Sequence, residues 1–189
     1  NASSWMKMGG KVIEILKSEA AQAARRTVEE ASIVIDAIFG TGLTKVVKGV
    51  HADAIRLING AAKNVLSIDI PSGVNATTGA VLGEAVKAGV TATMAMPKLG
   101  LFLSPGRSLS GRVEVVDIGV PKEVVEEPSI KWNLLVPSDM KTILKPRKQD
   151  AHKSSHGHLL VLAGSPGMTG AAYMSGMAAM RTGAGLVTV

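Results

Sequence analysis

The sequence predicts an α/β fold built on a parallel β-sheet, and three observations support this prediction. Short runs of apolar and β-branched residues alternate with amphipathic segments along the chain, as in strand–helix–strand units. Glycine-rich turns follow two of the apolar runs, and aspartates stand near the ends of two. Ligands of such sheets bind at the carboxyl ends of the strands, so we expect these turns and aspartates to mark the functional edge.

The first part of the chain contains the elements of one such domain. Residues 11–30 space their alanine and aliphatic side chains at helical intervals, which predicts a helix. Short runs rich in valine and isoleucine predict buried parallel strands at 32–38, 65–70, 90–94 and 113–118. Further helices are predicted at 51–63 and 84–88. A sheet of this kind is expected to carry helices on both faces.

The character of the chain changes at residue 121. Prolines and runs of charged residues are spread through residues 121–150, which predicts an interdomain linker. Within it, residues 138–144 have the pattern of a short helix, and Ser138 is a suitable N-cap.

Residues 151–189 have the pattern of a second strand–helix unit. We predict strands at 158–163 and from 186 onward, with a helix at 170–182 that Gly183 caps. So short a unit cannot close a hydrophobic core of its own. We therefore expect either that the polypeptide continues or that this unit packs on the first domain.

Composition excludes several classes of function. The chain has 189 residues and no cysteine, which excludes a disulfide scaffold, a thiolate zinc site and a cysteine nucleophile. The net charge is +6, but the basic residues are dispersed and aromatic residues make up only 3%, so we do not expect nucleic-acid binding. The sequence shows neither a secretory signal nor an apolar run of about 18 residues. We expect a cytoplasmic protein without a membrane partner.

Four ordered blocks of sequence resemble the NAD(P)H-hydrate epimerase family. They are Ile35–Leu43 (IDAIFGTGL), Ser67–Gly73 (SIDIPSG), Thr91–Gly100 (TATMAMPKLG) and Gly111–Gly119 (GRVEVVDIG). The motifs His152–Gly157, Leu160–Ser165 and Arg181–Leu186 resemble the start of the NAD(P)H-hydrate dehydratase domain, although Ser154 stands where that family has glycine.

The resemblance implies a domain order and a reaction. It implies a Rossmann-like three-layer epimerase domain over residues 1–120, the linker at 121–150, and the beginning of a ribokinase-like α/β domain at 151–189. The substrates it implies are the hydrates of NADH and NADPH, NADHX and NADPHX. The epimerase interconverts their R and S forms, and the dehydratase restores NAD(P)H from the S form with ADP (or ATP).

The family's asparagine- and glycine-rich loop and the nucleotide-binding motifs of its dehydratase do not occur in these residues. We therefore expect the chain to be a piece of a longer bifunctional protein, and inactive by itself. We also expect a homo-oligomer. Two rival functions remain open at this point: a non-catalytic binding module of the same fold, and a kinase of small alcohols.

Asp69 is the catalytic residue that the resemblance implies. Exchange of the hydroxyl between the two faces of the nicotinamide ring requires proton transfer and a field that tolerates a transient cation, and a carboxylate suits both tasks. The alternative is an aspartate that caps the following Pro-Ser-Gly turn.

Asp36 and Ser72 match positions at which the family holds a potassium ion. Oxygen ligands suit hard cations such as calcium and magnesium, and we extend this rule to potassium. The alternative for Asp36 is a buried carboxylate bonded to N–H groups of the glycine turn, and for Ser72 a simple turn serine.

The remaining candidates concern ligand binding. The loop Gly40, Thr41, Gly42, Leu43, Thr44, Lys45 and Val46 is expected to offer backbone N–H groups to the phosphates of the substrate, although it lacks a Walker motif. Ala171, at the start of the helix 170–182, matches a position of hydrate contact, and tight packing is the alternative. For Lys98 we favour a structural role over a phosphate contact. A zinc site at His152, His156 and His158 is not expected, because their spacing fits no known pattern.

Overall fold

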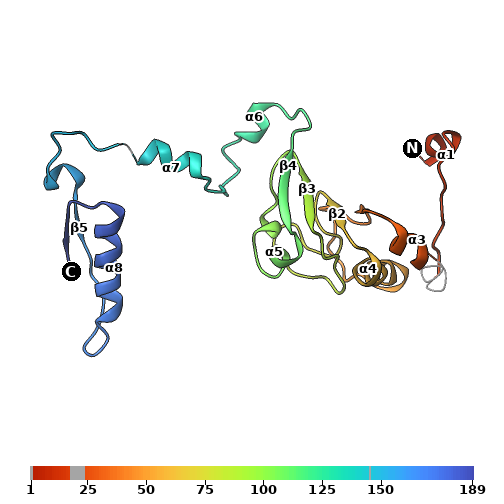
Figure 1. The fold of residues 1–189 in the computed structure, drawn as a ribbon, viewed down its shortest axis with the longest axis horizontal. Coiled ribbons are helices and arrows are strands. Elements are labelled where there is room, and N and C mark those ends of the chain that lie inside the picture. The colour runs from red at the N-terminus through yellow and green to blue at the C-terminus, as the bar shows by residue number, and fades with distance from the viewer. Residues whose placement is uncertain (1, 18–23, 145) are drawn as a thin grey trace. The chain divides into compact units, whose positions relative to one another are not determined.

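The computed structural model describes residues 2–17, 24–144 and 146–189 (Figure 1). The chain divides into two compact units, Asn1–Trp132 and Asn133–Val189, which are treated separately below. The first unit contains the predicted sheet and the candidate residues around it.

Four parallel strands form the sheet of the first unit (Figure 1). They are β1 (Val34–Asp36), β2 (Val65–Ile68), β3 (Val90–Met94) and β4 (Arg112–Val116), in the spatial order β1-β2-β3-β4. Asp36 is paired with Ser67, and Ser67 with Thr91, in neighbouring strands. The predicted α/β class is confirmed, and the carboxyl ends of the strands bring Asp36 and the residues after β2 and β3 to one edge.

Helix α4 (Gly49–Ala61) packs against this sheet through a continuous apolar core. It buries Ile55 and Ile58, which cluster with Val65 of β2 and with Val86. The predicted helix at 51–63 is therefore confirmed, with its start moved to Gly49 and its end to Ala61. Helix α3 (Arg25–Glu30) contacts α4, and α1 spans Ala2–Lys7.

Two helix predictions for this unit were wrong. Residues 11–17 are not helical, and residues 18–23 lie outside the described residues. Within the described part of the predicted range 11–30, only Arg25–Glu30 forms a helix. Residues 84–88 are not helical either. This segment runs between two cores and buries Ala85 in one and Val86 in the other, so its apolar side chains face two directions.

The backbone of the segment 84–88 finds its hydrogen bonds outside any helix. The Val86 N–H donates to the Ser72 carbonyl at 2.8 Å, and the Lys87 N–H donates to Asn59 Oδ1 at 2.8 Å. A buried backbone must be satisfied in some way, and these partners replace the helical bonds that the alanine-rich sequence suggested.

The second core lies under the connection between β2 and β3 and the short helices that follow β3. Ile70, Val74, Ala85 and Leu101 form it. Leu101 belongs to η1 (Leu99–Leu101), which is followed by α5 (Gly106–Leu109). This core holds the turn after β2, and with it Asp69 and Ser72, against the rest of the domain.

The other face of the sheet is more open. Strand side chains alternate between faces, and Ile35, on the face away from Asp36, is 59% exposed. Parallel sheets usually bury both faces, so a second layer of helices, as a three-layer arrangement requires, stays a prediction.

The second unit contains one strand–helix–strand element. Strands β5 (His158–Leu160) and β6 (Leu186–Thr188) pair in parallel, joined by α8 (Gly170–Thr182). The helix predicted at 170–182 is confirmed residue for residue. Gly183 ends it with φ 110°, a left-handed conformation that glycine adopts without a Cβ clash.

The segment before this element contains two short helices and one corrected detail. The helices are α6 (Lys122–Val125), at the end of the first unit, and α7 (Pro137–Ile143). Ser138 is not the N-cap of α7, because Pro137 occupies the first helical position and Val136 precedes it. The Asp139 carboxylate accepts a hydrogen bond from the Val136 N–H at 2.9 Å.

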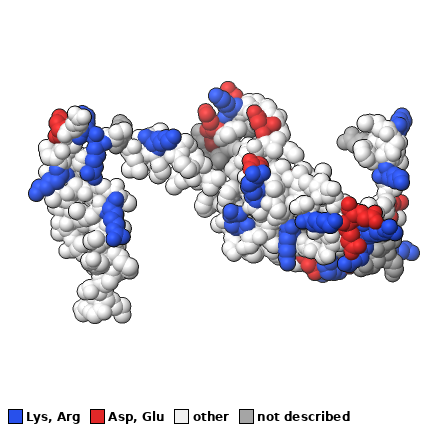
Figure 2. Space-filling view, in the orientation of Figure 1, with Lys and Arg blue, Asp and Glu red and all other residues white. Residues whose placement is uncertain are grey.

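Charged side chains of both signs are mixed on the surface of the first unit (Figure 2). Helix α3 carries the ion pairs Arg25–Glu29 and Arg26–Glu30, and Arg56 of α4 bonds Glu84 and Asp53. The hydrogen bond that Arg56 donates to Glu84, followed by the one that it donates to Asp53, raises the pKa of Arg56. Among the described residues, no helix is both long and apolar enough to cross a lipid bilayer.

Candidate active site

Asp36, at the carboxyl end of β1, is buried, and both of its carboxylate oxygens accept hydrogen bonds. Its side chain is 1% exposed. Oδ2 accepts hydrogen bonds from Ser67 Oγ at 2.7 Å and from the Ser72 N–H at 2.9 Å, and Oδ1 accepts one from Ser72 Oγ at 2.6 Å. A buried carboxylate requires such compensation.

Ser72 links this carboxylate to the glycine-rich turn. Its Oγ donates to Asp36 and accepts the N–H of Phe39 at 2.8 Å. The structure thus brings Asp36 and Ser72 into direct contact. The shortest bonds to Asp36 come from two serine hydroxyls. The backbone N–H of Ile38, just before the glycine turn, also donates to Oδ1 at 3.4 Å, which is a bond of the kind that the alternative for Asp36 expected. Ser67 was not singled out from the sequence, although a hydroxyl at a buried position of a strand was a usable signal.

Asp69 immediately follows β2 and has an unusual backbone conformation. Its φ is 70°, in the left-handed region that costs a residue other than glycine about 1–2 kcal/mol. Its N–H donates to the Ala92 carbonyl at 2.7 Å, which fixes this conformation to the neighbouring strand. Strained backbone of this kind often occurs at functional sites.

Among the described residues, one oxygen of the Asp69 carboxylate receives every hydrogen bond that this side chain accepts. Oδ1 accepts Lys98 Nζ at 2.5 Å, the Met94 N–H at 3.1 Å and Thr93 Oγ1 at 3.4 Å. Within the described residues, Oδ2 accepts no hydrogen bond. The carboxylate is therefore held from one side, and its second oxygen is available to a ligand.

Lys98 is the partner that the sequence did not predict. It forms an ion pair with Asp69, and its Nζ also donates to the Met94 carbonyl at 2.7 Å. The side chains of Lys98 and Asp69 are 20% and 22% exposed, so both keep access to solvent. The sequence favoured a structural role for Lys98 over a phosphate contact, and the structure places it beside the candidate catalytic carboxylate.

The loop of residues 40–46 lines an open hollow of about 620 Å³ with His51 of α4. A Cβ added to Gly40 or Gly42 would meet no atom within 4 Å. Among the described residues, no acceptor takes the N–H groups of Gly40, Thr41, Gly42, Thr44 or Lys45, whereas the Leu43 N–H bonds the Gly40 carbonyl at 3.3 Å. Gly40 and Gly42 therefore border open space, and close packing does not explain the absence of a side chain at either position.

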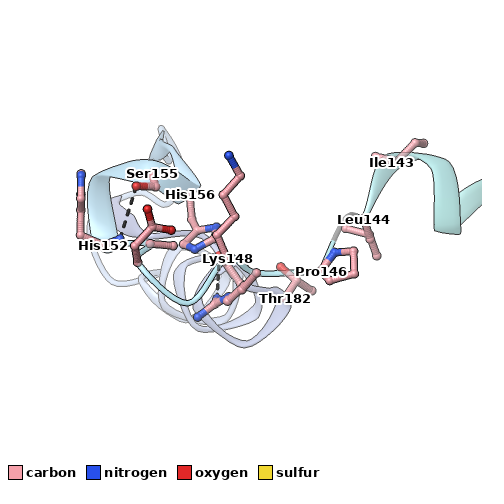
Figure 3. A pocket seen from close by; sticks show the side chains of 12 residues that line it. Ile143, Leu144, Pro146, Lys148, His152, Ser155, His156 and Thr182 are labelled. Atoms are coloured by element: carbon pink, nitrogen blue, oxygen red, sulfur yellow. Dashed lines mark hydrogen bonds between the residues drawn. The ribbon is translucent and has the colours of Figure 1, made fainter.

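The candidates of the second unit lie around η2 (Lys153–His156) and α8. Ala171 is exposed in the first turn of α8. His152 and His156 line a hollow of about 760 Å³ together with Lys148 and Thr182 (Figure 3). His158 Nε2 instead bonds Thr188 Oγ1 across β5 and β6 at 2.8 Å. No group of three or more His, Asp or Glu side chains in the described part of the chain has the arrangement of a metal site.

Comparison with known proteins decides the family. Residues 1–100 match the family described as YjeF-related protein N-terminus, which is more than half of the chain. The chain belongs to this family. The match contains β1, β2, β3 and the residues Asp36, Asp69, Ser72 and Lys98.

Relatives of this YjeF-related chain carry names that refer to NAD(P)H-hydrate. It is 41% identical over its whole length to the bifunctional NAD(P)H-hydrate repair enzyme of Moorella thermoacetica, covering 36% of that protein. A protein of the same name from Thermofilum pendens is 36% identical over 93% of the chain, which covers 33% of that relative. The NAD(P)H-hydrate epimerase of Levilactobacillus brevis is 51% identical over 48% of the chain and 42% of its own length. The chain thus spans about a third of the bifunctional relatives.

Proposed function

We propose that the first unit epimerises the R and S forms of hydrated NADH and NADPH. The Asp69 carboxylate supports this proposal most directly, because Oδ1 is held by donors while Oδ2 stays available at the carboxyl edge of the sheet. The names of the relatives supply the substrate class.

The reaction requires a proton to be given and then taken back. The hydrate carries its hydroxyl on a ring carbon next to nitrogen. The C–O bond breaks, its electron pair leaves with oxygen, and the oxygen takes a proton and departs as water. The lone pair of the ring nitrogen stabilises the cation that remains. Water then adds to the opposite face and releases a proton. We assign to Asp69 the stabilisation of the cation and the acceptance of this last proton.

The loop of residues 40–46 would hold the phosphates of the substrate. Its free N–H groups and the open space at Gly40 and Gly42 support this role, since successive backbone amides form anion-binding concavities. Lys45 and Lys48 also line the hollow and add positive charge there.

Asp36, at the end of β1, and Ser72, after β2, carry oxygen atoms of the kind that a potassium ion takes as ligands, and in the structure these oxygens hydrogen-bond to each other and to Ser67. Asp36 and Ser72 offer carboxylate and hydroxyl oxygens, and the Phe39 carbonyl lies 3.4 Å from Ser72 Oγ. This set contains only oxygen donors, as hard cations prefer. We propose that Asp36 and Ser72 would hold the ion, which would supply positive charge beside the bound nucleotide.

The dehydratase activity is a proposal for the complete polypeptide. Dehydration of the S form with ADP, and a ribokinase-like fold, are expected of a longer second domain to which residues 151–189 contribute, with Ala171 near the hydrate. We likewise propose a cytoplasmic homo-oligomer that acts on small molecules rather than on nucleic acid.

The test is the substitution Asp69→Asn in the full-length protein, with R and S hydrates separated by chromatography. We expect kcat to fall by about 100-fold or more, with substrate affinity unchanged within a few fold. Asp117→Asn is the matched control, because Asp117 follows β4 at the same edge but is exposed. A normal rate for Asp69→Asn would refute the assignment of Asp69. A wild-type protein that binds the hydrate without interconverting its forms would refute the proposed function and indicate a binding module.

A further inference from the structure

The Lys98 ammonium is placed to do more than neutralise Asp69. An ammonium group has three N–H donors. One bonds Asp69 Oδ1 at 2.5 Å and one bonds the Met94 carbonyl at 2.7 Å. Within the described residues, no acceptor takes the third. Since Lys98 is partly exposed, this donor is available to a ligand at the carboxyl edge of the sheet.

The chemistry of the proposed reaction requires an acid that Asp69 cannot supply. A carboxylate in an ion pair is only an acceptor, so it has no proton to give when the hydroxyl leaves. Within the part of the chain that the structure describes, Lys98 is the titratable side chain that bonds Asp69, while Thr93 and Met94 contribute a hydroxyl and a backbone N–H. Thr93 Oγ1, at 3.4 Å, is a weak partner, and a hydroxyl is a poor acid.

We propose that Lys98 is the general acid of the epimerisation, which rests on the function proposed above for Asp69. The Lys98 ammonium gives a proton to the departing hydroxyl, so that the C–O bond breaks and water leaves. The pair then consists of a neutral amine and a carboxylate beside the ring cation. When water adds to the opposite face, Asp69 takes its proton and passes it to the Lys98 amine across their hydrogen bond. This restores the ion pair, so no net proton is gained or lost. The reverse conversion follows the same steps backwards: Lys98 first passes its proton to Asp69, which gives it to the hydroxyl on the second face, and the Lys98 amine takes the proton of the water that adds to the first face.

The hydrogen bonds around Asp69 and Lys98 agree with the roles of base and acid assigned to them. Thr93 and the Met94 N–H hold Oδ1 in addition to Lys98, so Asp69 keeps an anchor when Lys98 becomes neutral. The Met94 carbonyl keeps Lys98 Nζ at the edge of β3. A purely positioning role would require only the charge and the hydrogen bond of Lys98, whereas an acid must also be able to lose its proton. Arginine has the first property and lacks the second.

The experiment compares wild type, Lys98→Arg, Lys98→Met and Lys98→Ala in the full-length protein, by the rate at which R and S hydrates interconvert. We expect both Lys98→Arg and Lys98→Met to lose about 100-fold or more in kcat. We expect added primary amines to restore part of the activity of Lys98→Ala, with a rate that varies systematically with the acidity of the amine. Circular dichroism and thermal unfolding identify any variant that fails to fold.

The outcomes separate this inference from the proposed function. If Lys98→Arg works within a few fold of wild type while Asp69→Asn is inactive, Lys98 only positions Asp69 and the general-acid role is refuted. Absence of amine rescue in a folded Lys98→Ala variant also refutes it. If wild type itself does not interconvert the hydrates, the proposed function fails, and the inference fails with it.

Discussion

Ser72 Oγ lies 2.6 Å from Asp36 Oδ1 and accepts the Phe39 N–H at 2.8 Å. One hydroxyl therefore connects the end of β1, the turn after β2 and the start of the glycine-rich loop. The turn after β2 is distant in sequence from the other two segments, and together the three carry the proposed cation ligands and the proposed phosphate loop. A change at Ser72 should consequently affect both the stability of the domain and the placement of the loop.

We expect Ser72→Ala and Ser67→Ala to differ in function although both remove a buried hydrogen bond to Asp36. Each should lower the free energy of unfolding by about 1–3 kcal/mol, because a buried carboxylate oxygen loses a partner. Only Ser72→Ala should abolish the stimulation of epimerisation by potassium over sodium, since Ser72 is a proposed ligand. Urea denaturation and rates in each salt measure the two effects. Equal potassium dependence in both variants would contradict the assignment of Ser72.

Substitution of Gly42 should affect substrate binding, whereas substitution of Gly73 should affect thermal stability. Gly42→Val adds a side chain in open space, so the thermal midpoint should stay close to that of wild type while KM for the hydrate rises about tenfold or more. Gly73→Ala is the contrasting variant. Gly73 has φ +98° and its added Cβ would meet the backbone of residues 84 and 85, so this variant should unfold at a clearly lower temperature. An unchanged KM for Gly42→Val would show that the loop does not approach the substrate.

The sequence predicted the existence and order of the strands and the two longest helices, because their signals are local, although β1, β2 and β5 are shorter than the runs that predicted them. Runs of valine and isoleucine define β1 to β4, and α8 begins and ends where its glycines predict. The helix predicted at 84–88 was wrong because tertiary packing decides the conformation of this segment. Its alanines and Val86 resemble a helix face, but Ala85 and Val86 belong to two separate cores. The Val86 and Lys87 N–H groups bond Ser72 and Asn59, which are remote in sequence.

The site was only partly predictable for a related reason. Asp36, Asp69 and Ser72 were selected by motif, and the parallel sheet brings Asp36 and Ser72 together. The ion pair between Asp69 and Lys98 depends on the turn after β3, where Ala95 has φ 60° and the Lys98 side chain returns to the edge of the sheet. A local pattern contains no indication of this return. For Ser67 the sequence does offer a signal, a hydroxyl in a buried strand, but its partner Asp36 depends on the register between β1 and β2.

A comparison of Ile55→Ala, in the core between α4 and the sheet, with Ile35→Ala, on the opposite face of the sheet, should show whether that opposite face is covered in solution. Ile55→Ala removes a fully buried side chain between α4 and the sheet, and should lower the free energy of unfolding by about 2–5 kcal/mol. Ile35→Ala is the matched control on the opposite face, where Ile35 is 59% exposed, and should cost less than about 1 kcal/mol. Urea denaturation of the full-length protein measures both values. A cost for Ile35→Ala close to that for Ile55→Ala would mean that another layer, from a helix or a second copy of the chain, packs on this face, as the three-layer prediction requires.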